Sequence, residues 1–163
     1  MYKSFIRPTL EYGCFVWDNC DEESKNMLDN KIKVEAATGG IKSTLHQALY
    51  DEVGWETLRS RREQHKLLLY HKMVHNDAPE YLSHLVPSMV DKNHGYSTRQ
   101  SEQTDYNLSN CRLELYCTSF LPDTVRLWNL LPNDIKDISN FYLFKTVIQK
   151  QSQKRKTNVL LLK

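Results

Sequence analysis

The segment TLRSRREQHKLLLYHKMVHN, residues 57 to 76, predicts the longest helix of the chain. Thr57 is of a residue type that caps helix N-termini, and neither glycine nor proline follows it before Pro79. The apolar residues of the segment form two stripes at helical spacing, Leu58 with Leu69 and Met73, and Leu67 with Tyr70 and Val74. Because apolar residues cover much of its circumference, we expect this helix to be central.

Helical patterns also occur on both sides of this segment. They cover residues 2 to 17 with a break at Pro8, a helix capped by Asp18 or Asn19 and stopped at Gly39, and the stretches 44–53, 77–85, 119–131 and 139–150. Residues 88 to 110 lack this periodicity and predict a loop with a short strand near 96–99. The alternation of Leu113, Leu115 and Cys117 predicts another strand. The expected fold class is mainly α, with a small β-strand or hairpin element and C-terminal helices.

Length and composition are those of an ordinary globular chain, with 163 residues, 40% hydrophobic and 26% charged. We expect a helical module over residues 1–86. Residues 87–150 then supply a loop, short strands and two C-terminal helices packed on that module, and residues 151–163 form a flexible basic tail.

Basic residues are unevenly distributed, although the net charge is only +2. Residues 111 to 163 hold nine basic and four acidic groups. Two stretches stand out as candidates for contact with phosphates: Arg59, Arg61, Arg62 and Lys66 on the long helix, and Lys154, Arg155 and Lys156 in the tail, with Lys150 and Lys163 on either side and no acidic residue between them. For the long helix, a solvated face with salt bridges to acidic neighbours explains the same residues equally well.

No constellation of residues predicts a reaction. The densest acidic run, Asp21-Glu22-Glu23, lies where a helix should begin, and negative charge is favourable there. The cysteine pairs Cys14 and Cys20, and Cys111 and Cys117, are spaced too widely for a typical zinc knuckle. His71 and His75 have the spacing of helical metal ligands but no third ligand. We therefore predict no catalytic residue, no metal and no cofactor.

Cysteines without an apolar N-terminal leader indicate a reducing compartment, so we expect an intracellular protein, nuclear or cytoplasmic, that is not secreted. The longest uncharged apolar run, residues 159 to 162, is too short to span a bilayer, and no membrane partner is predicted. The tryptophans, Trp17, Trp55 and Trp128, are predicted as packing anchors in preference to platforms for stacking bases.

Three separated blocks, residues 2–13, 55–62 and 119–132, resemble in sequence and in order the C-terminal part of reverse transcriptases from CR1-like or jockey-like non-LTR retrotransposons. The resemblance implies a helical, thumb-like module that grips an RNA or DNA duplex by its backbone. It assigns this contact to Arg59, Arg61, Arg62 and Lys66, and secondarily to Arg126, which alternatively pairs with a carboxylate inside the module.

In that family the catalytic carboxylates and their Mg²⁺ belong to an upstream palm domain. The resemblance therefore implies a non-catalytic part of an RNA-directed DNA polymerase, with the palm domain as a partner. One departure is that Thr38-Gly39 follow Ala37 at once, where the family continues for about one more helical turn. A different function remains open: an orphan helical domain that binds a protein partner or itself and has no role with nucleic acids.

Overall fold

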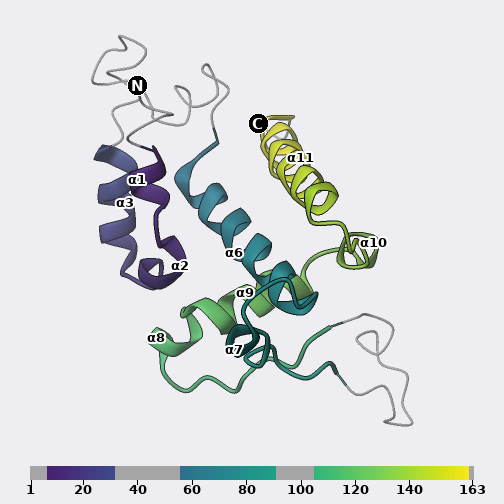
Figure 1. Cartoon of the computed structure of the whole chain (residues 1–163). Coiled ribbons are helices and arrows are strands. Elements are labelled where there is room, and N and C mark those ends of the chain that lie inside the picture. Colours follow the sequence, from purple (N-terminus) through teal and green to yellow (C-terminus); the bar gives the residue numbers. More distant parts are fainter. Residues whose placement is uncertain (1–6, 32–55, 91–104, 162–163) are drawn as a thin grey trace. The chain divides into compact units, whose positions relative to one another are not determined.

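The structure, a computed structural model, describes residues 7–31, 56–90 and 105–161, with side chains for 7–27, 56–90 and 105–152 (Figure 1). Its described part is mainly helical, which confirms the predicted fold class. The helices are α1 (Arg7–Glu11), α2 (Cys14–Trp17), α3 (Glu22–Lys31), α6 (Leu58–Val74), α7 (Glu80–Ser83), α8 (Glu114–Cys117), α9 (Phe120–Asn129), α10 (Asn133–Lys136) and α11 (Phe141–Leu161). Within these ranges, β-type pairing is limited to an isolated antiparallel bridge between Met89 and Tyr106.

The chain divides into two compact units, Met1–Arg62 and Glu63–Lys163. The boundary falls inside α6, whereas the sequence suggested a division after residue 86. A helix that crosses a boundary carries no break in its hydrophobic pattern, so sequence periodicity gives no sign of such a division.

In the first unit, short-range polar contacts set where the helices start. Gly13 adopts the left-handed conformation, with φ of 60°, which glycine tolerates at little cost, and it separates α1 from α2. Asp21 caps α3, because its Oδ2 accepts a hydrogen bond from the backbone N–H of Ser24 at 2.9 Å. The predicted helix start is confirmed for the acidic run, but the cap is Asp21 and not Asp18 or Asn19.

The second unit is built around three large side chains from α6, α9 and α11. Tyr70, Trp128 and Phe144 are at most 2% exposed. The rings of Tyr70 and Trp128 meet edge to face, with centroids 5.2 Å apart, and those of Trp128 and Phe144 lie 5.7 Å apart. The helix predicted over 119–131 is confirmed by α9, and Val125, Trp128 and Leu131, which follow one another at a spacing of three residues, are all buried.

Helix α6 begins and ends where its sequence predicts. The Thr57 Oγ1 accepts a hydrogen bond from the Ser60 N–H at 3.3 Å, and the chain leaves the helix through Asn76, a non-glycine residue with φ of 59°. The Thr57 cap fixes the start of the helix, and the left-handed conformation of Asn76 fixes its end.

Asn129, at the end of α9, holds the loop that precedes α8. Its Nδ2 donates to the carbonyl of Tyr106 at 2.9 Å, and its Oδ1 accepts from the N–H of Tyr106 at 3.0 Å. Lys136 of α10 donates to Asp105 Oδ1 at 2.7 Å and to the Asn129 carbonyl at 3.2 Å. Asp105, Tyr106 and Lys136 are each at most 7% exposed, so these bonds satisfy polar groups that are shielded from water.

Two sequence predictions are corrected by the described residues, and one helix is added. Residues 114–117 form helix α8 and not a strand, with hydrogen bonds from Cys117 N to Leu113 O and from Thr118 N to Glu114 O, both at 3.0 Å. Leu113 and Leu115 are 72% and 67% exposed, so their alternation marks no buried strand face. Helix α10 was not predicted, and α11 continues through Leu161 where we expected a flexible tail.

Other predictions concern residues outside the described ranges. They are the helix end at Gly39, the helix over 44–53, the strand near 96–99 and the anchoring role of Trp55. Across the part of the chain that is described, no helix is both long and apolar enough to traverse a bilayer.

Candidate nucleic-acid interface

Arg61 of α6 forms ion pairs inside the first unit. Its Nε and Nη2 both donate to the carboxylate of Glu11, the latter at 2.9 Å, and its Nη1 lies 3.5 Å from Glu56 Oε2. Hydrogen bonding to Glu11 raises the pKa of Arg61 above its usual value. A two-pronged contact of this kind fixes the direction of the guanidinium.

Arg62 is more deeply enclosed. It is 3% exposed, its Nε lies 2.7 Å from Asp18 Oδ1, and its guanidinium lies 5.7 Å from the centre of the Trp17 ring. Trp17 in turn donates its indole N–H to the Tyr12 carbonyl at 3.1 Å. Arg62 and Trp17 therefore act as packing residues of the first unit.

Lys66 and Arg126 share one carboxylate in the second unit. Lys66 Nζ lies 2.7 Å from Asp123 Oδ2, and the Lys66 side chain is only 4% exposed. Arg126 Nη1 lies 3.9 Å from Asp123 Oδ1, at the edge of ion-pair range, and its side chain is 54% exposed. Of these two cations, Arg126 is the one that a phosphate in solution can reach.

The predicted cations thus differ mainly in how far they are exposed to solvent. Arg61, Arg62 and Lys66 are held by carboxylates, and two of them are nearly excluded from solvent. This is the salt-bridged helix that the sequence left open as an alternative. Arg59 lies on the exposed side of α6 and Arg126 on that of α9. Removing one partner of a buried ion pair lowers the free energy of unfolding by about 3–5 kcal/mol. We therefore assign Arg61, Arg62 and Lys66 a structural role.

Helix α11 carries the largest uninterrupted set of cations. Its 21 residues, Phe141–Leu161, include five basic residues and no acidic one: Lys145, Lys150, Lys154, Arg155 and Lys156. Lys145 and Lys150 are exposed, while Phe144 and Ile148 on the opposite side enter the core. A helix of this length extends about 31 Å, enough to follow several phosphates.

Sequence reasoning counted Lys150 with the basic tail but missed Lys145. The signal was present, because no Asp or Glu occurs after Asp137, but we ended the last helix near residue 150 and treated the cations beyond it as a separate tail. The structure places Lys154, Arg155 and Lys156 on the same helix as Lys145 and Lys150.

His71 of α6 is fully buried in the second unit, and His75, the residue that follows the helix, is partly buried beside it. The rings of His71 and His75 stack with centroids 4.1 Å apart, and His71 also stacks on Phe144 at 4.3 Å. His71 Nε2 lies 2.7 Å from the Ile138 carbonyl, so Nε2 carries the proton and Nδ1 does not. Nδ1 is buried without a partner, and desolvation lowers the pKa of His71.

Because the His71 and His75 rings are stacked, their nitrogen lone pairs do not point toward a common position. This arrangement does not suit the binding of one metal ion by both histidines. In the ranges that the structure describes, no three His, Cys, Asp or Glu side chains gather in an arrangement able to hold a metal ion.

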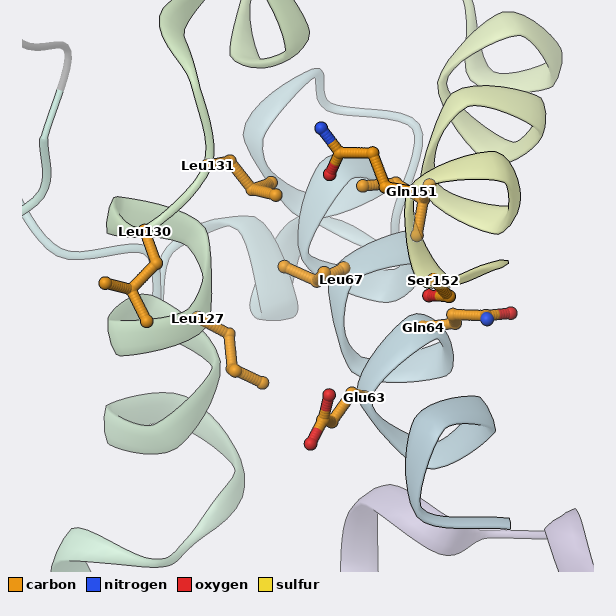
Figure 2. A pocket seen from close by; sticks show the side chains of 9 residues that line it. Glu63, Gln64, Leu67, Leu127, Leu130, Leu131, Gln151 and Ser152 are labelled. Carbon is orange, nitrogen blue, oxygen red and sulfur yellow. The ribbon is translucent and has the colours of Figure 1, made fainter. Parts of the chain in front are cut away.

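A shallow groove of the second unit lies between α6, α9 and α11 and encloses about 410 Å³ including solvent at its mouth. Figure 2 shows Leu67 and Leu127 pointing into it, with Gln151 and Ser152 at its α11 edge. The walls are largely aliphatic, and Glu63 is the one carboxylate among the lining residues. This lining offers no pair of groups for acid–base or nucleophilic chemistry.

No protein family model, curated protein or solved structure matches this chain.

Proposed function

We propose that this chain binds RNA or DNA through the phosphate backbone, without sequence preference and without catalysing a reaction of its own. The observation that carries the proposal is α11, a helix with five basic and no acidic residues on which Lys145 and Lys150 are exposed. Arg126, whose side chain is 54% exposed beside Asp123, is an additional exposed cation, and Arg61, Arg62 and Lys66 support the structure through their ion pairs.

Lysine and arginine side chains on a regular rod suit this function for a physical reason. Each phosphate that they neutralise releases condensed counterions, and the resulting affinity depends on charge and not on base identity. No carboxylate on α11 competes with a phosphate for these cations. The expected contact is therefore sensitive to salt and tolerant of sequence.

The ordered blocks 2–13, 55–62 and 119–132 support a retrotransposon origin for this function. On this proposal the chain corresponds to the C-terminal region of a reverse transcriptase, works beside a palm domain that supplies carboxylates and Mg²⁺, and acts inside the cell, in the nucleus or cytoplasm. The described part of the last block has clear structural uses, because Trp128 fills the core and Asn129 fastens the Tyr106 loop.

The proposal is tested by equilibrium binding of a mixed-sequence duplex to the full chain. The variant Lys145→Gln/Lys150→Gln removes two exposed charges from α11. The control Tyr81→Glu/Asn110→Asp changes the net charge by the same amount at exposed positions outside α11. We expect weaker binding for the α11 variant than for the control. Equal affinity of both variants, or no binding by the wild type at low salt, would overturn the proposal.

A second candidate function is binding of a protein partner or self-association. It is favoured by α8 and the residue before it, because Leu113, Leu115 and Tyr116 are 72%, 67% and 49% exposed. Sedimentation analysis of the wild type and a Leu113→Ser/Leu115→Ser variant distinguishes it. A concentration-dependent oligomer that the variant loses, together with absent nucleic-acid binding, would favour this second function.

A further inference from the structure

Tyr142 is a large aromatic side chain that α11 presents to solvent. It is the second residue of the helix and is 78% exposed, whereas Phe144, two residues later, is fully buried. The Oδ1 of Asn140 accepts hydrogen bonds from the backbone N–H groups of Tyr142 and Leu143, at 3.0 and 3.1 Å. The exposed ring therefore belongs to the capped first turn of a long helix.

The ring of Tyr142 is supported by the residue before it. The centroids of the Phe141 and Tyr142 rings lie 5.8 Å apart and their planes meet at 73°, an edge-to-face contact. The Phe141 ring is contacted in turn by a cation, because Lys72 Nζ, near the end of α6, lies 4.6 Å from its centre. An aromatic pair and a lysine thus lie together where α11 begins.

A second lysine lies on the other side of Tyr142 along the helix. Lys145 is exposed and follows Tyr142 by three residues, and residues at this spacing are neighbours on the surface of an α-helix. The helix contains no acidic residue. An exposed aromatic ring and an exposed ammonium group on one side of a helix can contact a base and a phosphate of the same strand.

The surrounding charge separates Tyr142 from the other exposed tyrosines of the described ranges. No acidic residue lies within four positions of Tyr142 on either side. The others each follow a glutamate by one or two positions: Tyr12 after Glu11, Tyr81 after Glu80, and Tyr116 after Glu114. A neighbouring carboxylate makes the surface less attractive to a phosphate. Of these tyrosines, Tyr142 is therefore the one whose surroundings best suit a nucleic acid.

We propose that Tyr142 stacks on an unpaired base of single-stranded RNA or DNA while Lys145 contacts a phosphate of the same strand. The inference rests on the proposed function and adds to it a class of ligand, the single strand. In a duplex the faces of the bases are covered by neighbouring base pairs, so the ring gains a stacking contact only from an unpaired base. Every base has such a face, so stacking adds no sequence preference.

The test compares the affinity of the full chain for three ligands at one salt concentration: a mixed-sequence single strand, an abasic strand of the same length, and a duplex. The abasic strand keeps the phosphates and lacks a stacking partner. We expect Tyr142→Ser to bind the base-bearing strand at least about fivefold more weakly than the wild type, and to bind the other two ligands within about twofold of it. The base-bearing strand is tested as RNA and as DNA, and a loss with either supports the stacking and identifies the ligand.

Two further variants are controls. Tyr142→Phe keeps the aromatic ring and should bind like the wild type, and so should Tyr81→Ser, which removes a tyrosine that is 70% exposed outside α11. Equal binding of the base-bearing strand by Tyr142→Ser and the wild type would overturn the inference. So would an equal loss on the abasic strand.

The proposed function is judged by a different comparison. It requires that the wild type binds the abasic strand and the duplex, and that Lys145→Gln/Lys150→Gln weakens both. If these requirements are met while Tyr142→Ser changes nothing, only the stacking inference fails. If the wild type binds none of the three ligands at low salt, both fail.

Discussion

Replacing Asn129 by alanine tests the account of how α9 holds the Tyr106 loop. The change removes a donor to the Tyr106 carbonyl and an acceptor from the Tyr106 N–H, bonds of 2.9 and 3.0 Å. Tyr106 is 7% exposed, so water cannot readily replace both partners. At about 1–2 kcal/mol for each unsatisfied backbone group, the expected loss in the free energy of unfolding is about 2–4 kcal/mol.

Urea unfolding followed by circular dichroism measures this loss, with Asn110→Ala as the matched control. Asn110 is an exposed asparagine of the same loop, and its replacement should cost less than about 0.5 kcal/mol. Hydrogen exchange adds a local readout, because the Tyr106 amide should exchange faster in the Asn129 variant. A loss no larger than that of the control, with unchanged protection of Tyr106, would refute the reasoning.

Three further predictions concern the core of the second unit. Trp128→Ala should lower the free energy of unfolding by about 3–5 kcal/mol in urea titrations, because it empties the centre of the Tyr70 and Phe144 cluster. Lys136→Met should cost about 3–5 kcal/mol by leaving the Asp105 carboxylate buried and unpaired, and adding Asp105→Asn should recover part of that loss. Stability should also fall between about pH 7 and about pH 5, and most of the fall in this range should disappear in His71→Gln.

The sign of that pH effect follows from the buried imidazole. The folded state lowers the pKa of His71 below 6.5, so the unfolded chain binds the extra proton first. Stability should be constant above about pH 7, should fall as the pH drops below 6.5, and should level off for this group below its folded-state pKa. His75 and Asp77 are the titratable groups whose charges act on it, with opposite effects. Carboxylates begin to titrate below about pH 5, so the comparison is made above that pH. If the stability of His71→Gln falls there as much as that of the wild type, His71 is not the group responsible.

The sequence was most informative for the longer periodic patterns, as in α6, which also has the cap residue Thr57, and in α9, which has no side-chain cap. It failed for α8 and α10, single turns of four residues that present no amphipathic period. Alternation of Leu113 and Leu115 resembled a strand because periodicity does not reveal whether a side chain is buried.

The cations illustrate a second limit. The sequence identified Arg61 and Lys66, but their partners Glu11 and Asp123 lie 50 and 57 residues away, and no local pattern connects them. Whether a cation is buried in an ion pair therefore depends on tertiary contacts, which a local sequence pattern does not reveal. For α11, by contrast, the absence of acidic residues after Asp137 was visible from the start.

The most direct test of the proposed function is the salt dependence of duplex binding by the wild type and by a variant in which Lys145, Lys150, Lys154, Arg155 and Lys156 are all glutamine. If these five cations each neutralise one phosphate, the slope of log affinity against log salt should be steeper in the wild type by about 4.5, or about 500-fold in affinity between about 50 and about 200 mM salt. Equal slopes for the two proteins, or no measurable binding by the wild type at about 50 mM salt, would contradict the account.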